Sequence, residues 1–284
     1  MTPHPPPLNP VVLKVGGREL AIGPELEQLA RLVAGLESRG RRVVVVHGGG
    51  EEVTDRAEAL GLRTTRHRGL RVTSAPMLEV VVEVLAGRVN TRLVAALGKV
   101  GVPAVGLSGA DSRLLTVRPA GEPAGALGFV GVPHEVHPGA LAAVLTAGLT
   151  PVVAPLGVDA HGQVHNVNAD LAASALAAAL GAELYLVTDV PGVRDRSGRV
   201  RATLNVTEAR RLVESGAATD GMIPKLEAVW SALAEGAPGA WIGPLSGLSP
   251  EGPKAGAGTT LRLSPNRPGT VPLLLPPFAS GRGS

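Results

Sequence analysis

The 284-residue chain contains no cysteine, which excludes disulfide bonds, thiolate catalysis and metal sites with cysteine ligands. Aromatic residues are almost as scarce: two Phe, two Trp and one Tyr are too few for the stacking platform on which proteins bind single-stranded nucleic acid. Basic and acidic side chains nearly balance, 27 against 24, and no basic run forms a nucleic-acid footprint. We therefore expect no nucleic-acid partner.

Long apolar runs are missing as well. No segment reaches the roughly 18 uninterrupted apolar residues of a membrane-spanning helix, and the beginning, MTPHPPPLNP, contains no apolar signal-peptide core. We therefore expect no membrane association and a cytoplasmic location. Hydrophobic residues still make up 44% of the chain, which is enough for one large or two small cores and excludes disorder throughout.

Lysine is rare in a chain that is rich in arginine. Lys14, Lys99, Lys225 and Lys254 stand against 23 arginines, a ratio typical of a coding bias that replaces lysine wherever arginine serves equally well. Lysine differs from arginine in carrying a compact point charge. The four lysines are therefore candidates for chemistry that needs such a charge.

Two short apolar runs end in glycine turns. Residues 11–15 lead into glycines 16–17, residues 42–47 lead into glycines 48–50, and residues 24–39 between them place leucines at helical spacing. The pattern predicts a βαβ unit with two buried parallel strands. A right-handed crossover then brings both glycine turns to the same carboxyl edge of the sheet.

The rest of the chain continues an α/β pattern. We expect helices at about 51–60, 75–97, 140–147, 170–180, 207–215 and 224–235, and strands at 103–107, 151–155, 184–189 and 240–242. The stretch 61–73 suits a β-hairpin, and residues 113–135 suit short antiparallel strands. We place a lobe boundary near residue 180, and residues 264–284 form a tail rich in Pro and Gly.

Both glycine turns expose backbone N–H groups near the start of a helix, where an anion is favourably bound. A single glycine pair is more often a tight turn that needs a positive φ, whereas two such turns on adjacent strands favour an anion site. His47 precedes the triple glycine, where it can hydrogen-bond within the turn. Neither turn matches a Walker A loop or a dinucleotide-binding fingerprint, so a nucleotide would need another cradle.

Two lysines lie at unusual positions. Lys14 lies inside the first apolar run, where a lysine is costly unless its ammonium group finds a partner at the strand end; the alternative is a side chain that extends to solvent. Lys225 lies in the first turn of a predicted helix, where the helix dipole disfavours a cation unless an anion lies between them. The alternative there is an ordinary exposed lysine.

Three polar side chains come together in Asn166-Val167-Asn168-Ala169-Asp170, which joins an extended segment to a helix. Alternation points both asparagines and Asp170 to one side if the stretch is extended. The alternative is that Asn168 or Asp170 is only a helix N-cap. The seven histidines lack zinc-binding spacing, and no nucleophile elbow occurs, so we predict no metal bound by side chains.

Seven motifs occur in one order along the chain: KVGG (14–17), HGGG (47–50), GLRVT (69–73), VGLSGADS (105–112), NVNAD (166–170), TDVPGV (188–193) and TDGMIPK (219–225). Together they resemble the amino acid kinase family, and within it the members that phosphorylate N-acetyl-L-glutamate. The resemblance spans residues 11 to about 262. It implies an α/β fold, an open αβα sandwich whose central, mostly parallel sheet has helices on both faces.

The resemblance also assigns roles. It implies that the amino-terminal lobe, 11–180, binds the amino acid and forms the dimer, and that the carboxyl-terminal lobe, 181–263, binds ATP. Lys14 and Lys225 are the implied transition-state stabilisers, and Asp170 is the residue that orients them. The implied binders of N-acetyl-L-glutamate are Gly49, Gly50, Arg71 and Asn166, with Arg71 pairing a substrate carboxylate. The implied ATP-binding residues are Gly16, Gly17, Asp189, Val190, Pro191, Gly192, Val193, Arg194, Ala217, Ala218 and Thr219.

The implied reaction is the ATP-dependent phosphorylation of the γ-carboxylate to N-acetyl-L-glutamyl 5-phosphate and ADP, in arginine biosynthesis. This carboxylate is ionised at pH 7, so no general base is needed, which agrees with the absence of a His/Asp or Ser/His motif. The reaction needs charge neutralisation and in-line positioning. Two lysines, glycine-turn amides and Mg²⁺ carried on the ATP phosphates would supply them.

Two alternatives stay open at this point. A related kinase acts on carrier-protein-linked aminoadipate or glutamate in lysine or ornithine biosynthesis, and a non-catalytic amino-acid sensor on the same fold should have lost a lysine or Asp170. The resemblance further implies a homodimer through the helix at 75–97. Because the proline-rich beginning differs from the added helix that links arginine-inhibited members into hexamers, we expect no inhibition by arginine.

Overall fold

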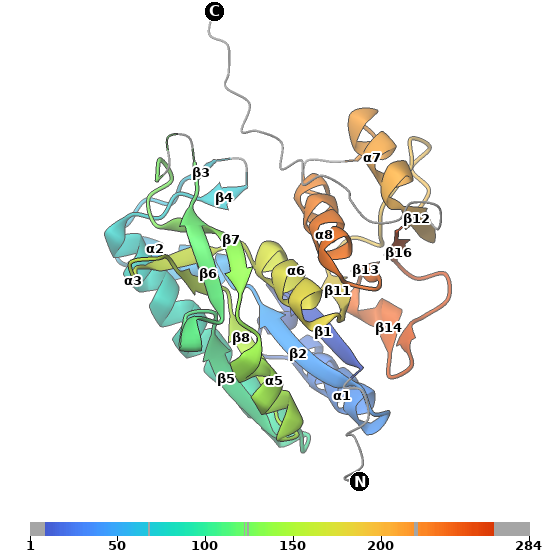
Figure 1. Ribbon diagram of the computed structural model, residues 1–284, viewed down its shortest axis with the longest axis horizontal. Helices are drawn as coiled ribbons and strands as arrows, with labels where there is room; N and C mark the ends of the chain where they lie inside the picture. Colours follow the sequence, from blue (N-terminus) through green and yellow to red (C-terminus); the bar gives the residue numbers. More distant parts are fainter. Residues whose placement is uncertain (1–8, 68, 122, 124, 219–220, 264–284) are drawn as a thin grey trace, which may run out of the picture.

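The computed structural model describes residues 9–67, 69–121, 123, 125–218 and 221–263 (Figure 1). Residues 1–8 of the proline-rich beginning, Thr219 and the tail at 264–284 lie outside the described residues. In the part of the chain that is described, no helix combines the length and the apolar character needed to cross a bilayer.

Eight strands form one central sheet in the order β12-β16-β13-β11-β1-β2-β8-β5. Their bounds are β1 Pro10–Val15, β2 Arg42–His47, β5 Ala104–Ser108, β8 Thr150–Ala154, β11 Glu183–Val187, β12 Thr203–Asn205, β13 Ala240–Gly243 and β16 Thr259–Arg262. The pairing of β13 with β16 is antiparallel, and the other pairings of this sheet are parallel. The predicted βαβ unit and mostly parallel sheet are therefore confirmed.

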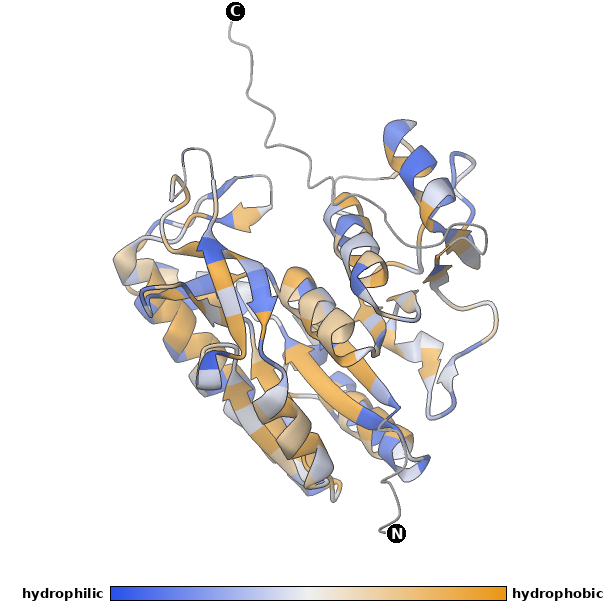
Figure 2. Cartoon of the chain, in the orientation of Figure 1, coloured by the Kyte–Doolittle hydropathy of each residue, from blue (hydrophilic) through white to orange (hydrophobic). Residues whose placement is uncertain are grey.

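Helices cover both faces of this sheet (Figure 1). One layer contains α1 Pro24–Ser38, α2 Gly50–Ala59, α3 Ala75–Val82 and α4 Asn90–Lys99, and the other contains α5 Gly139–Thr146, α6 Ala169–Leu180, α7 Val206–Glu214 and α8 Ile223–Glu235. Figure 2 shows the apolar strands between the two layers. The molecule is thus the predicted αβα sandwich.

The residues of β1 alternate between the two layers. Val11, Leu13 and Val15 pack toward the layer that contains α1, α3 and α4, whereas Val12 packs toward α6 and α8. Period-two alternation puts Lys14 on the same side as Val12. The strand therefore directs the lysine toward the layer that contains α6 and α8.

The predicted helix at 75–97 is interrupted by a π-helical segment. Ser74 caps α3 by accepting a hydrogen bond from the N–H of Met77, the π segment Glu83–Val89 follows, and α4 continues to Lys99. Such insertions often occur at functional sites. Here the π segment contacts the second glycine turn, since a Cβ atom added to Gly49 would lie 2.7 Å from Leu85 Cδ2.

A smaller, closed sheet lies beside the carboxyl edge of the main one. It contains β6 Leu115–Pro119, β7 Val130–Val136, β9 Leu156–Val158 and β10 Val164–Val167. The antiparallel β6–β7 pair confirms the expectation for residues 113–135, but the parallel β7–β10 pairing was not predicted. The expected hairpin also forms, as β3 Arg66–His67 and β4 Leu70–Arg71. A further hairpin pairs β14 Leu248–Ser249 with β15 Gly252–Pro253.

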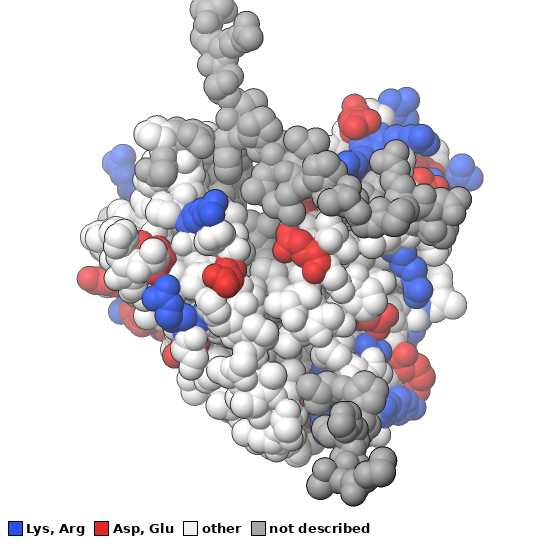
Figure 3. Space-filling view, viewed as in Figure 1, with Lys and Arg blue, Asp and Glu red and all other residues white. Residues whose placement is uncertain are grey.

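Charged side chains are unevenly distributed over the face shown in Figure 3, and its lower central part is largely uncharged. This region includes α5, whose sequence GALAAVLT has no charged residue. Leu141 and Leu145 of this helix are buried against the sheet. Its outward side therefore consists of small neutral residues.

The proposed lobes share one continuous sheet. Gly181 ends α6 with a left-handed φ of +58°, and β11 then pairs in parallel with β1. Strands on either side of residue 180 are thus direct neighbours. A lobe boundary near residue 180 stays a prediction. Such a boundary would run through one continuous sheet and would not lie between two separate cores.

Candidate active site

Lys14 forms a buried ion pair at the carboxyl end of β1. Its Nζ atom lies 2.9 Å from Asp170 Oδ1, and the two side chains are 11% and 9% exposed. A buried ammonium group is tolerated when such a partner compensates for lost hydration. The alternative, a lysine that extends to solvent, is therefore wrong.

Asp170 is held at this position by the start of α6. Asn168 is the N-cap, and its Oδ1 accepts hydrogen bonds from the N–H groups of Asp170 (2.8 Å) and Leu171 (3.2 Å). The cap alternative thus applies to Asn168 but not to Asp170, whose carboxylate points away from the cap toward the lysines. The positive end of the helix dipole also favours a carboxylate in this first turn.

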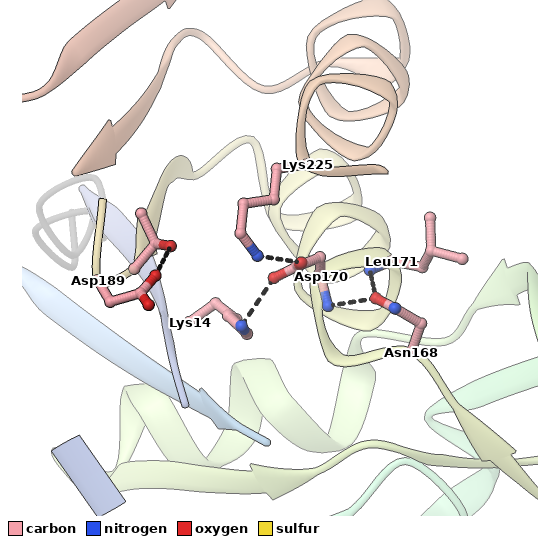
Figure 4. Close-up of polar contacts among 7 residues, drawn as sticks. Lys14, Asn168, Asp170, Leu171, Asp189 and Lys225 are labelled. Carbon is pink, nitrogen blue, oxygen red and sulfur yellow. Dashed lines mark hydrogen bonds and ion pairs between the residues drawn. The ribbon is translucent and has the colours of Figure 1, made fainter. Parts of the chain in front are cut away.

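Lys225 approaches the same carboxylate from α8. Its Nζ donates a hydrogen bond to Asp170 Oδ2 at 2.9 Å. Figure 4 shows the two ammonium groups on either side of Asp170. Burial alone would raise the pKa of Asp170, but the two lysines outweigh this effect and lower it to about 2. The cluster Lys14–Asp170–Lys225 therefore holds one surplus positive charge at neutral pH.

The second glycine turn leads directly into α2. Gly48 N–H donates to Val15 O of the neighbouring strand at 2.8 Å, which ties the turn to the end of β1. Gly49 has a φ of +140° and stands at the N-cap of α2, where no side chain caps the helix. The first N–H groups of α2 are therefore left for an anion.

Arg71 and Asn166 line the same cavity as this turn, and Arg71 contacts the turn directly. Arg71 is 7% exposed, and its Nη2 donates to Gly50 O (2.6 Å) and Thr54 Oγ1 (2.8 Å). Its Nη1 is buried and has no hydrogen-bond partner in the structure. Asn166 donates to Thr73 Oγ1 at 3.1 Å. An unpartnered buried guanidinium nitrogen is costly, so this site is suited to an anionic ligand.

These groups line one cavity of about 260 Å³. It brings together most of the predicted catalytic and amino-acid-binding residues, together with the first glycine turn: Lys14, Gly16, Gly17, Gly49, Gly50, Arg71, Asn166 and Asp170. Arg66, which the sequence did not single out, also lines it. The cavity therefore combines anion-binding amides, guanidinium groups and the Lys14–Asp170 pair, whereas Lys225 reaches Asp170 from outside its lining.

The predicted ATP residues of the second lobe lie outside the lining of this cavity. Asp189 is exposed and accepts a hydrogen bond from Thr188 Oγ1 at 3.3 Å. Val193 is fully buried, and its N–H donates to Thr259 Oγ1 at 2.8 Å, so this amide is not available to a ligand. Ala217 is partly exposed and Ala218 is nearly buried, beyond the end of α7.

Two carboxylates, Glu19 and Asp189, lie near Lys14. Burial raises the pKa of Glu19, with Lys14 opposing the effect and Asp189 adding to it. In the described part of the chain, no group of three histidine or carboxylate side chains is arranged to hold a metal ion.

His47 and Asn90 form a buried network behind the glycine turn. Asn90 Nδ2 donates to Val152 O at 2.8 Å and lies 3.2 Å from His47 Nε2. Because the amide nitrogen faces a carbonyl, Nε2 of His47 must accept, and Nδ1 must donate to Gly48 O at 2.8 Å. The hydrogen bond of His47 within the turn is confirmed, whereas Asn90 was missed.

Burial lowers the pKa of His47 to about 4, which predicts a defined pH dependence of stability. Between about pH 6.5 and 4 the unfolded chain binds a proton that folded His47 does not, so stability falls as the pH decreases, by about 3 kcal/mol from this group. Urea unfolding at pH 7 and 4.5 measures the loss. The loss should shrink in His47→Gln but not in His161→Gln, an exposed control. Equal losses in both variants would contradict the neutral imidazole.

Comparisons with known proteins agree on one family. A model described as the amino acid kinase family matches residues 9–243. An acetylglutamate kinase of Acidiphilium cryptum is 41% identical over 243 residues, 82% of this chain and 81% of the relative. One of Sorangium cellulosum is 45% identical over 241 residues, 80% of this chain and 84% of the relative.

A solved structure is also similar to this chain, at lower identity. N-acetylglutamate synthase from Neisseria gonorrhoeae, complexed with coenzyme A and N-acetyl-glutamate, matches with a TM-score of 0.76 and 27% identity. The match covers 90% of this chain and 60% of the synthase chain.

Proposed function

The chain belongs to the amino acid kinase family, and we propose that it transfers the γ-phosphoryl group of ATP to the γ-carboxylate of N-acetyl-L-glutamate, giving N-acetyl-L-glutamyl 5-phosphate and ADP. Relatives that share 41% and 45% of their residues with it over about four fifths of the chain are named acetylglutamate kinase. The observation that carries the proposal is the Lys14–Asp170–Lys225 cluster at the end of a cleft with anion-binding groups. Arginine biosynthesis is the pathway that this activity serves.

The amino-acid substrate would lie between the glycine turn and the β3–β4 hairpin. The unpartnered Nη1 of Arg71 would pair the α-carboxylate, and Asn166 would hydrogen-bond the substrate next to it. The amides at Gly49 and Gly50 would hold the γ-carboxylate at the start of α2. This orientation directs the γ-carboxylate toward Lys14 and away from Arg71.

The phosphoryl transfer would need no general base. An oxygen of the ionised γ-carboxylate attacks the γ-phosphorus, and the bond to the bridging oxygen of ADP breaks as that oxygen takes up the electron pair. Lys14 and Lys225 would stabilise the charge that develops on the transferred group and the leaving oxygen. Asp170 would hold both ammonium groups in place at 2.9 Å without joining the reaction.

The site suits a polyphosphate because the lysine–aspartate cluster carries one surplus positive charge beside Gly16 and Gly17. The remaining nucleotide contacts would come from backbone groups of residues 189–194 and 217–219. The N–H of Val193 is excluded, because Thr259 already accepts it. Mg²⁺ would arrive on the ATP phosphates and add to the neutralisation of their charge.

Formation of the acyl phosphate tests the function directly. Purified protein with Mg-ATP and hydroxylamine should yield a hydroxamate from free N-acetyl-L-glutamate. Product only from a carrier-linked aminoadipate or glutamate would favour the related kinase, and binding without product would favour a sensor. The presence of both lysines and Asp170 in one cluster supports a catalyst over a sensor.

We also propose a cytoplasmic homodimer. The apolar residues of the long helix mostly face the chain's own core, which leaves Leu78 and Val82 at helical spacing on its outer side. Val82 is 38% exposed, and Val82→Glu should therefore convert the dimer to a monomer. Light scattering measures the mass; a wild-type monomer or hexamer would contradict the proposal.

A further inference from the structure

Two arginines stand directly opposite each other in the β3–β4 hairpin. The register pairs Arg66 with Arg71. Like charges at directly opposed positions destabilise a strand pair, and a hairpin with two residues in each strand has few other contacts to compensate. The arrangement is therefore unfavourable in the absence of an anion.

Both guanidinium groups converge on the start of α2. A Cβ atom added to Gly50 would lie 3.3 Å from Nη2 of Arg66 and 4.0 Å from Nη2 of Arg71. Nη1 of Arg66 donates to Gly69 O at 3.2 Å, which holds the side chain across the hairpin. The two side chains thus approach the cavity from the same side.

Neither guanidinium group has a carboxylate counter-ion in the part of the chain that the structure describes. Among the described residues, no aspartate or glutamate oxygen lies within 4.0 Å of either arginine. The hydrogen-bond partners of Arg71 are neutral oxygens, and its Nη1 has none. This end of the cavity therefore contains two positive charges and one hydrogen-bond donor without a partner, and an anion would satisfy all three.

We propose that Arg66 is a second, specificity-determining arginine, which with Arg71 clamps the α-carboxylate of the substrate. The inference rests on the proposed function and adds that a free α-carboxylate is required for tight binding. Because Arg66 is exposed, its contribution is screened by salt. An analogue with a neutral α-carboxamide, N-acetyl-L-isoglutamine, keeps the reacting γ-carboxylate but removes the charge that the clamp recognises.

The test compares Arg66→Gln with the wild type on both substrates. For N-acetyl-L-glutamate we expect a loss in kcat/KM of about tenfold, the effect of one charge-assisted hydrogen bond, mainly through a higher KM. For the α-carboxamide we expect no change. The matched control is Arg63→Gln, which removes the same charge from the same segment but does not line the cavity. The loss should decrease as ionic strength rises.

Several outcomes would overturn the clamp. Equal losses on both substrates, a higher KM for ATP instead of the amino acid, or no loss at all would each exclude a contact with the α-carboxylate. Thermal unfolding without ligand should show Arg66→Gln at least as stable as the wild type, because the like-charge pair is removed. If the wild type phosphorylates neither substrate, the proposed function fails, and calorimetric titration of N-acetyl-L-glutamate into both proteins still tests the clamp.

Discussion

Lys14→Arg is expected to lower kcat by about a hundredfold or more, although it keeps the charge. The ammonium group of Lys14 lies 2.9 Å from Asp170 and passes close to the first glycine turn, since a Cβ atom on Gly16 would be 3.3 Å from Nζ. A planar guanidinium group is wider, and its donors are fixed in a fork. The guanidinium group would therefore reach past Asp170 or displace the glycine turn. Its fixed donors also could not follow the charge that shifts on the phosphoryl group during its transfer.

The matched control is Lys99→Arg. The side chain of Lys99 is 74% exposed and pairs with Glu27 on the surface, so the same substitution should change kcat by less than twofold. Steady-state rates of ADP release measure both variants, and calorimetric titration of ATP shows whether Lys14→Arg still binds nucleotide. Full activity in Lys14→Arg would show that the point charge of lysine is not required.

The need of Lys14 for a partner at the strand end was predictable from the sequence because its determinants are local. An ammonium group two residues before a glycine turn, inside an apolar strand, has few compatible partners. The parallel βαβ unit fixes where that strand ends. The role of Asp170 came from the motif resemblance instead, because the residues alone left open whether Asn168 or Asp170 caps the helix; the structure shows that Asn168 does.

Arg66 was not predictable in this way. Its importance depends on the register that sets it opposite Arg71, and a hairpin with two residues in each strand has no alternating apolar pattern to reveal the register. Asn90 was missed for a related reason. A π-helical segment precedes it, and the resulting shift in helical phase turns this residue inward toward His47.

The segment 188–193, which the resemblance assigns to ATP, shows a third kind of limit on prediction from sequence. Motif resemblance assigned residues 188–193 as a block, but the structure distinguishes them individually. Gly192 has a φ of +139°, and a Cβ atom there would lie 2.8 Å from Thr259 Oγ1. Val193 donates its N–H to the same hydroxyl. Gly192 and Val193 thus both shape the loop, and under the proposed function only the N–H of Val193 is withheld from ATP.

Asp170→Asn is expected to lower kcat by about a hundredfold or more while leaving nucleotide binding intact or tighter. The amide keeps the shape of the carboxylate but removes the charge that holds Lys14 and Lys225 at 2.9 Å. The two ammonium groups then repel each other and lose their fixed positions. The net charge of the cluster rises from one surplus positive unit to two, which favours binding of the ATP phosphates in the ground state. Rate measurements with calorimetric titration of ADP separate the two effects.

The same variant should be less stable, by about 3 kcal/mol, because it removes the shared partner of two largely buried cations. The pH dependence identifies the cause. The pKa of Asp170 is about 2 in the folded protein, below its unfolded value, so its contribution is present above about pH 4 and is lost as the pH falls toward 2. Urea unfolding between pH 5 and 2.5 should show equal losses in the wild type and in Asp55→Asn, an exposed control, and a smaller loss in Asp170→Asn.

This acidic range lies below the range assigned to His47, so the two groups can be distinguished in one titration series. A wild-type curve that falls first below pH 6.5 and again below pH 4 would report the glycine turn and then the lysine cluster. Asp170→Asn should reduce the second fall and keep the first, since His47 hydrogen-bonds to Gly48 and Asn90 and not to the lysines. If Asp170→Asn retained wild-type kcat and both falls, the aspartate would neither position the lysines nor stabilise the site.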